Sequence, residues 1–332
     1  SEISPLANTL LTWEKGRKVN VGLDLTLLKN RLTLSADYYN DYYYDILQSR
    51  GKSIQLLGIA YPAENIGKTR YYGLETQLSW QDHIGKVNYY VSANWSMEQN
   101  KRLFMDEQYV PYDYLKMTGQ PIGTIYGLVA TGFLTAKDIA DGYPVMNGFN
   151  NIQAGDVKYK DQNGDNRIDE KDVVKMFGSS VPRFYFGFNL NFSYKRLELS
   201  ADFQGMTGVT VSLLNSPLYS PLVSNGNISN TFLNEEISWT PENKTNATMP
   251  RLTTQENLNN YRASSLWYRD GSFLKLRNLL VAYTFPKSQT RFADLKVFVQ
   301  GTNLFSLDNI HFADPEQLGI AYPSTRSYWA GI

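Results

Sequence analysis

The chain has 332 residues, with 32 basic and 32 acidic side chains, no cysteine and two histidines. Its balanced charge provides no basic surface for nucleic acid, and the lack of cysteine excludes disulfides, thiolate nucleophiles and cysteine-bound metals. His83 and His311 are far apart in the sequence, so a histidine-based triad or metal site is also disfavoured.

The first two predicted elements are residues 19–27 and 32–38. In both segments apolar and polar side chains alternate, which predicts strands with one apolar face. Only residues 28–30 separate the segments, so we expect a hairpin. The apolar faces consist of Val19, Val21, Leu23, Leu25, Leu27, Leu32, Leu34, Ala36 and Tyr38.

Three further hairpins are predicted by the same pattern. We expect residues 74–80 to pair with 87–95, residues 184–194 with 197–203, and residues 274–285 with 295–305, and a ninth strand to begin at Ser327. Within 274–285 the alternation changes phase near Arg277 and Asn278, which predicts a β-bulge.

Short turns alternate with long connections, which run over about residues 48–70, 100–180, 205–272 and 306–326. In outer-membrane barrels the short turns face the periplasm and the long loops face outside. Aromatic side chains in the third connection would either contact a substrate or partner, or pack within the loop; they are Tyr219, Trp239, Trp267 and Tyr268.

The apolar faces fit either a soluble β-sandwich or a lipid-facing surface. Mean hydropathy is −0.39, and no run approaches the roughly 18 apolar residues of a membrane helix. A transmembrane barrel, however, places its apolar side chains at alternate positions. The opposite faces are rich in Asn, Ser, Asp and Gln and poor in lysine, as a water-filled lumen requires. We therefore predict an all-β, antiparallel transmembrane β-barrel, with an aromatic girdle formed by Tyr38, Tyr39, Tyr42, Tyr43 and Tyr44.

Nine strands cannot close an even-numbered barrel. Residues 1–16 have the character of a preceding loop, and the last segment, SYWAGI, is shorter than the nine to eleven residues of a tilted strand crossing. We therefore expect residues 1–332 to be one portion of a larger barrel.

Six segments, in order along nearly the whole chain, carry a resemblance to a known family. They are TWEK with Asn20, Gly22 and Asp24; GQPIGTIYGLVATGF (119–133); GDVKYKDQNGDNRID (155–169); WTPENKTNATMPRL (239–252); LKLRNLLVAYTFP (274–286); and FVQGTNLFSL (298–307) followed by Asp314, Pro315 and Glu316. The chain resembles the C-terminal barrel portion of the SusC/RagA family, the TonB-dependent outer-membrane transporters of Bacteroidota.

This resemblance implies a barrel of 22 strands, of which the chain would supply the last nine. It also implies an N-terminal plug domain and TonB-contacting region that this chain lacks, and a SusD-like surface lipoprotein that caps the barrel. The implied function is TonB-dependent import of a glycan or oligopeptide across the outer membrane. The barrel would be surrounded by membrane lipid, and the protein would not be an enzyme.

An acidic segment, residues 160–172, lies within the predicted long extracellular loop 100–180. Its spacing matches an EF-hand calcium loop, with Asp161, Asn163, Asp165, Arg167 (through its carbonyl), Asp169 and Asp172 at positions 1, 3, 5, 7, 9 and 12. The template's glycine at position 6 is Asn166, and Asp172 replaces the usual glutamate. We expect structural Ca²⁺ here; the alternative is a solvated acidic turn before a short helix near residues 170–177.

The sequence is also compatible with two other functions. One is a passive porin or adhesin barrel, which the presence of a plug domain would reject. The other is a secreted, soluble β-rich enzyme acting on glycans, which would stay in solution without detergent.

Overall fold

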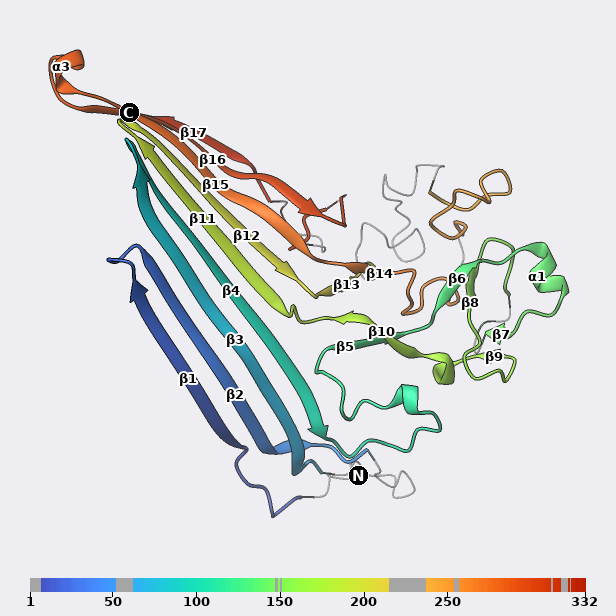
Figure 1. The fold of residues 1–332 in the computed structure, drawn as a ribbon. Coiled ribbons are helices and arrows are strands. Elements are labelled where there is room, and N and C mark those ends of the chain that lie inside the picture. The colour runs from blue at the N-terminus through green and yellow to red at the C-terminus, as the bar shows by residue number, and fades with distance from the viewer. Residues whose placement is uncertain are drawn as a thin grey trace.

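A computed structural model describes residues 7–51, 62–146, 149, 151–214, 237–253, 257–311, 313–317, 322 and 324–332. Its main feature is one nine-stranded antiparallel sheet in which strand order follows chain order (Figure 1). The strands are β1 (Lys15–Leu27), β2 (Leu32–Gln48), β3 (Glu64–Ile84), β4 (Val87–Phe104), β11 (Phe184–Tyr194), β12 (Leu197–Thr207), β15 (Phe273–Phe285), β16 (Leu295–Asp308) and β17 (Ser327–Gly331). The predicted four hairpins and ninth strand are confirmed.

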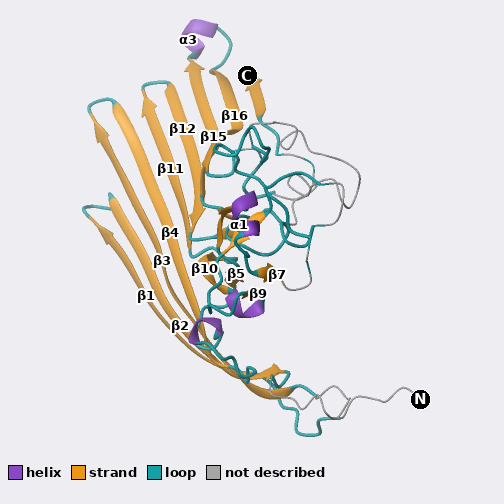
Figure 2. Cartoon of the chain, turned by 90° about the vertical axis from the view of Figure 1, so that its right-hand side faces the viewer, coloured by secondary structure: helices purple, strands orange, loops and turns teal. Residues whose placement is uncertain are grey.

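The sheet is strongly curved, and all its short turns lie at one end (Figures 1 and 2). The β1–β2 turn consists of Leu28, Lys29 and Asn30, each with φ between 55° and 66°. Gly85 and Lys195 adopt the same left-handed conformation in the next two turns, as tight hairpins require. The fourth turn contains α3 (Lys287–Thr290). None of the described helices is long and apolar enough to span a membrane.

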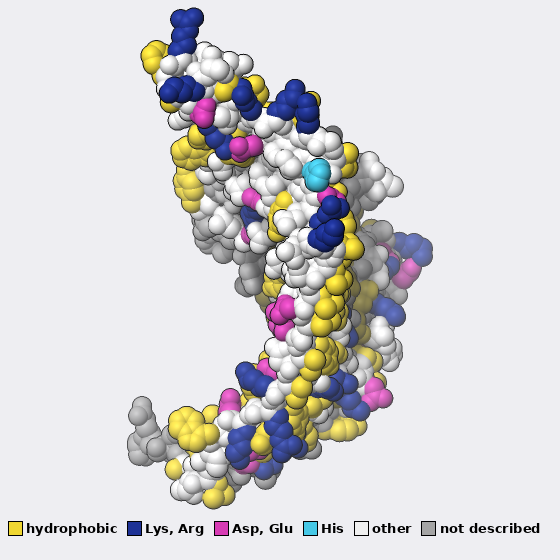
Figure 3. Space-filling view, turned by 60° about the vertical axis from the view of Figure 1, so that its left-hand side comes forward, with side chains coloured by type: hydrophobic (Ala, Val, Ile, Leu, Met, Phe, Trp, Pro, Cys, Tyr) yellow, Lys and Arg dark blue, Asp and Glu magenta, His cyan; other side chains and the backbone are white. Residues whose placement is uncertain are grey.

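The apolar face of the sheet is exposed. Val21, Leu78 and Val299 are 63%, 47% and 57% exposed, and hydrophobic side chains form a continuous band along the curved sheet (Figure 3). Across β4, β11 and β12 the register places Val91, Leu190 and Ala201 in one row of this face. A β-sandwich would bury such a face against a second sheet, but no described element does so.

The opposite face is polar and lies on the side of the long connections (Figure 2). Asn189 donates to Asp202 across β11 and β12, and Asn278 of β15 donates to the other Asp202 oxygen at 3.2 Å. Because successive side chains in a strand point to opposite faces, these polar residues interleave with the exposed apolar ones. One face suits lipid and the other suits water.

The predicted β-bulge is confirmed at Arg277. Arg277 has no register partner in either neighbouring strand. In β12, Phe203 pairs with Leu276 and Asp202 with Asn278, and the register with β16 also passes from Leu276 to Asn278. Asn303 in β16 has φ 52°, so both strands are irregular at the same level. The bulge explains why the alternation changes phase there.

The predicted tyrosine girdle needs correction. Strand alternation places Tyr38, Tyr42 and Tyr44 on the exposed face, where Tyr42 stacks on Tyr44 with ring centroids 5.5 Å apart. Tyr39 and Tyr43 belong to the polar face; Tyr43 contacts Tyr71 edge to face at 5.8 Å. Consecutive residues in a strand cannot all face lipid, so only three of the five tyrosines can serve that role.

The second and third long connections contain further short elements. They are η2 (Asp113–Leu115), β5 (Thr124–Gly127), β6 (Ala130–Phe133), α1 (Ala136–Ala140), β7 (Val145–Met146), β8 (Val157–Tyr159), β9 (Arg167–Ile168), η3 (Glu170–Asp172), β10 (Val174–Ser179), β13 (Thr210–Ser212) and β14 (Tyr268–Asp270). β5 pairs with β10, β6 with β8 and β13 with β14, all antiparallel, and β7 pairs with β9 in parallel.

Candidate functional site

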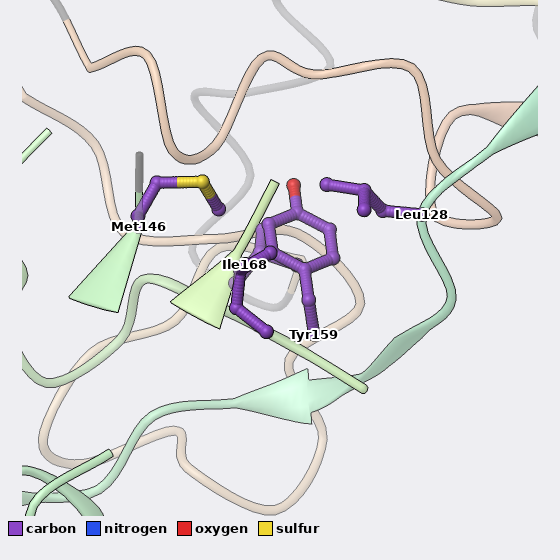
Figure 4. Packing of buried hydrophobic residues seen from close by; sticks show 5 residues of the cluster. Leu128, Met146, Tyr159 and Ile168 are labelled. Carbon is purple, nitrogen blue, oxygen red and sulfur yellow. The ribbon is translucent and has the colours of Figure 1, made fainter. Parts of the chain in front are cut away.

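The second and third long connections pack together at the end of the sheet opposite the short turns (Figure 1). One buried cluster consists of Leu128, Met146, Val157, Tyr159 and Ile168, each at most 2% exposed (Figure 4). The other consists of Leu213, Met249 and Trp267. Leu266 packs against both clusters, so the two connections share a hydrophobic core.

A buried charge joins the two connections. Asp156, which is fully buried, accepts a hydrogen bond of 2.7 Å from Arg251 Nε. Asn257 and Asn260 each donate to the same carboxylate at 3.0 Å, and the Gln153 backbone donates to its second oxygen at 2.8 Å. A buried carboxylate is stable only when its lone pairs are satisfied in this way. These five residues are hereafter the loop-joining network.

Further hydrogen bonds fix the register of the two connections. The Val157 backbone donates to Asn260 Oδ1 at 2.8 Å, and Asn259 Nδ2 donates to the Val157 carbonyl at 2.9 Å. Trp267 Nε1 donates to the Asn260 carbonyl at 2.7 Å. Tyr159 donates to the Asn259 carbonyl at 2.6 Å, and burial raises the pKa of its hydroxyl. The connections therefore form one rigid unit.

The glycine-rich segment 119–133 meets the same unit. The Leu128 backbone donates to the Ala263 carbonyl at 2.9 Å, and its carbonyl accepts from Ser265 at 3.0 Å. Ser265 Oγ accepts from the Ala130 backbone at 2.9 Å. A Cβ atom on Gly127 would lie 2.9 Å from the Ala263 carbonyl oxygen, so only glycine permits this approach.

The described aromatic residues of the third connection pack within it or against the second connection. Trp267 is fully buried and lies 5.4 Å from the Tyr261 ring. Gly155 has φ 91°, and a Cβ atom there would overlap the Trp239 indole. Tyr268 is 9% exposed, and its hydroxyl donates to the Tyr126 carbonyl. Tyr219 is outside the described residues. The described aromatics therefore stabilise the loops rather than present a binding surface.

A second ion-pair cluster attaches the last connection to the sheet. Lys275 on β15 is 4% exposed, forms an ion pair with Asp314 and contacts Glu316 at 2.6 Å. Arg277, at the bulge, binds both Glu316 oxygens at 2.6 and 2.8 Å. Burial opposes ionisation of both carboxyls, but it is outweighed by hydrogen bonds, chiefly from Lys275 to Asp314 and from Arg277 and Lys275 to Glu316, so the pKa values of Asp314 and Glu316 are lowered.

The predicted calcium residues lie in a loop organised by its own hydrogen bonds. Asp161 accepts from the backbones of Gly164 and Asn166 at 2.7 and 2.8 Å. Asn163 Oδ1 accepts from the Asp165 backbone at 2.9 Å, and Asp165 Oδ1 accepts from the Arg167 backbone at 3.0 Å. Hydrogen bonding from Asn163, together with that from Arg167, lowers the pKa of Asp165.

The later predicted ligands have capping roles. Asp169 is the N-cap of η3 and accepts from the Lys171 backbone, while Asp172 accepts from the Asp169 and Gln162 backbones at 2.8 and 2.7 Å. Arg167 lies in β9. Among the described residues no three carboxylate or histidine side chains are grouped closely enough to hold a metal. The types and order of the oxygen donors match the EF-hand template, but the structure does not bring the carboxylates together around one point.

The helix considered near residues 170–177 is wrong beyond its first turn. Only Glu170–Asp172 is helical, as a 3₁₀ turn, and β10 follows directly at Val174. β10 pairs with β5, about fifty residues upstream. A distant partner therefore decides the conformation of this segment.

The sequence reasoning missed the loop-joining network and the Lys275 cluster. The central ion pair of the loop-joining network, Asp156 with Arg251, joins the segments 155–169 and 239–252, and the Lys275 cluster joins 274–286 to the residues after 298–307. All four segments had been singled out for their family resemblance. Charged residues of opposite sign in such segments were the available signal.

Comparison with known proteins gives one consistent result. The family described as "TonB dependent receptor-like, beta-barrel" matches residues 2–304. TonB-dependent receptors P3 and P26 of Formosa agariphila are 27% and 26% identical to the chain, over 99% and 93% of it. The chain covers 35% and 32% of their lengths, so it spans about a third of the curated relatives it matches.

Solved structures agree on the fold. The RagAB peptide importer in its 'open-open' state matches 99% of the chain with a TM-score of 0.70 and 21% identity. The 'closed-closed' state gives 0.67 and 22% over 99% of the chain. In both comparisons the chain covers little more than a third of the solved protein, 35% and 36%.

Proposed function

The chain belongs to the family of TonB-dependent receptor-like β-barrels, and from this membership we propose that the whole protein imports a nutrient through the outer membrane, energised by the TonB complex. The relatives are receptors and importers rather than enzymes, so the soluble glycan-active enzyme is set aside. Contact with TonB, and the plug that it would move, would come from parts of the protein N-terminal to this chain.

One observation carries the proposal beyond family membership. The sheet exposes apolar side chains on one face and hydrogen-bonded polar side chains on the other. Such two-sided strands are what a barrel wall between lipid and a water-filled lumen requires. Charges are absent from the apolar rows at the level of Leu190, where each would cost about 2–4 kcal/mol.

A SusD-like surface lipoprotein is the proposed partner. The rigid unit formed by the second and third connections projects from the loop end of the sheet and offers a fixed surface for such a partner. The RagAB neighbours are described as a peptide importer. We propose an oligopeptide or a glycan as the substrate class, since lumen-facing Asn, Ser and Tyr side chains suit either.

Uptake by whole cells tests the proposal. Cells expressing the full-length protein as their only copy should accumulate labelled oligopeptide or oligosaccharide, and removal of TonB should abolish this uptake. Deleting residues 105–183 should also abolish it while leaving TonB intact. Uptake that persists without TonB would instead support the passive porin, and absence of the protein from the outer-membrane fraction would reject both.

We also propose that residues 160–172 bind Ca²⁺. Asn166 has φ 63°, the left-handed conformation for which the template uses glycine at position 6. Asp161 accepts hydrogen bonds from the backbones of Gly164 and Asn166, and Asp165 accepts one from the backbone of Arg167, so both carboxylates are already held within this loop. Binding would neutralise the loop's carboxylates and stiffen it.

A further inference from the structure

The exposed face changes character in regular rows near the loop end of β1–β4. The register places Val21, Tyr38, Leu74 and Met97 in one row across the four strands. The next row on this face, two residues further along each strand, is Val19, Asn40, Tyr72 and Gln99. The row after that is Arg17, Tyr42, Arg70 and Lys101, hereafter the basic row. Apolar side chains thus give way to polar ones and then to cations.

The cations of the basic row are exposed and carry no carboxylate partner among the described residues. Arg17 lies over the Tyr44 ring at 5.6 Å. Arg70 donates from Nε to Asn40 at 2.9 Å and lies over the Tyr72 ring at 5.4 Å. These contacts orient the guanidinium groups but do not neutralise them. Figure 3 shows Lys and Arg side chains near the lower end of the hydrophobic band, with acidic and further hydrophobic side chains among them.

The basic row is electrostatically unfavourable in isolation. Arg70 and Lys101 are direct cross-strand partners, and like charges in that relation destabilise a sheet. None of the twelve positions in the three rows is a carboxylate. The neighbouring Lys15 pairs with Asp45 at 2.9 Å, so that carboxylate is already engaged. An anion from outside the protein would remove the repulsion.

We propose that the basic row binds the phosphate groups of a glycolipid in the outer leaflet of the membrane. The face below the row is the one assigned to lipid, so acyl chains would lie on Val21, Leu74 and Met97 while the phosphates meet Arg17, Arg70 and Lys101. Arginine binds phosphate through two parallel N–H groups, and the Nε contact of Arg70 leaves its terminal nitrogens for that purpose. This inference rests on the proposed function, because it requires the sheet to lie in the outer membrane.

The test uses the full-length protein and two variants with equal loss of charge. The first replaces Arg17, Arg70 and Lys101 by Gln. The control replaces Lys29, Lys86 and Lys195 by Gln; these exposed cations lie in the short turns at the other end of the same sheet. Folding of each is checked by its mobility in electrophoresis before and after boiling. If the triple variant does not fold, Arg70→Gln alone is used.

Binding is measured by native mass spectrometry with bisphosphorylated lipid A and with its dephosphorylated form, in the same detergent. The wild-type protein and the control should prefer the phosphorylated lipid, and the basic-row variant should lose roughly tenfold or more of that affinity. Equal binding by the variant, or no preference in the wild-type protein, would overturn the inference. If lipid binding fails this test but TonB-dependent uptake is intact, only the lipid-binding inference is rejected. If the protein is absent from the outer membrane, the import proposal and the lipid-binding inference are both rejected.

Discussion

At the scale of single residues, Asp156 has the largest consequences for the loops. It has no exposed surface and accepts hydrogen bonds from four residues of both long connections. Removing one partner of a buried ion pair leaves an uncompensated charge, which costs about 3–5 kcal/mol. The loss should be felt in both connections, because the carboxylate is shared between them.

We therefore expect Asp156→Ala to make residues 100–180 and 237–272 protease-sensitive together, while the sheet stays folded. Limited proteolysis of the full-length protein with mass mapping would measure this. Asp141→Ala is the matched control, because Asp141 forms only an exposed pair with Lys137, which is worth less than about 1 kcal/mol. Cleavage confined to one connection would show that the network does not couple them.

The calcium prediction also belongs to individual residues. Asp161→Ala combined with Asp165→Ala should remove Ca²⁺-dependent protection of residues 105–183 from protease. In the wild-type protein, chelator should produce the same cleavage, and added Ca²⁺ should reverse it. Asp113→Ala is a suitable control, since this carboxylate is 92% exposed and pairs only with Lys116. Identical cleavage of the wild-type protein with and without chelator would rule out the calcium site.

At the scale of elements, the two faces of β11 give a direct test of what each contacts. Leu190 belongs to the apolar face of the sheet, whereas its neighbour Asn191 belongs to the polar face. Leu190→Arg should therefore destabilise the inserted barrel by about 2–4 kcal/mol, while Asn191→Arg should change stability little. Urea unfolding in lipid vesicles, followed by tryptophan fluorescence, would compare the two. Equal effects would contradict the assignment of the faces.

The attachment of the last connection to β15 should depend on pH. The pKa of Asp314 is lowered from 3.8, chiefly by Lys275, and that of Glu316 from 4.5 by Arg277 and Lys275, so both carboxylates bind protons less readily in the folded state. Their contribution to stability is therefore complete above these ordinary values and is lost as the pH falls through the lowered ones. Hydrogen exchange at residues 306–317 should accelerate on acidification below about pH 4.

A double variant isolates this effect. In Asp314→Asn with Glu316→Gln, exchange at residues 306–317 should already be fast at neutral pH and should no longer respond to acid. Glu198→Gln serves as control, because its pair with Lys296 lies near the short turns, at the other end of β15 and β16. Unchanged acid dependence in the double variant would assign the response to other groups.

The elements also show what sequence can and cannot predict. The strands of the main sheet, and even the bulge at Arg277, can be predicted from side-chain alternation, because alternate residues of each strand face an apolar and a polar environment. The loop contacts have no such period. Asp156 and Arg251 are 95 positions apart, and β10 depends on β5, so neither could be located from local pattern. The predicted tyrosine girdle was wrong for Tyr39 and Tyr43, because consecutive residues of a strand point to opposite faces.

At the scale of the whole molecule, an open, curved wall replaces the enclosed core of a soluble protein. β1 and β17 do not pair with each other, and the described hydrophobic clusters lie in the connections rather than between sheets. The full-length protein should therefore leave the membrane fraction only with detergent, and its electrophoretic mobility should change on boiling. Release by salt or alkali alone would contradict a membrane-spanning wall.

The position of residues 105–183 between β4 and β11 has a consequence for the order of assembly. Each doubling of an intervening loop adds about 0.6 kcal/mol to the entropic cost of closing it, so this pair should lag behind the neighbouring hairpins. Pairing of β5 with β10 shortens the flexible path by joining residues 124 and 179. If the β5–β10 pair forms early, it brings β11 close to the unpaired edge of β4. Residues 105–183 would then assist folding of the sheet as well as form part of the outer surface.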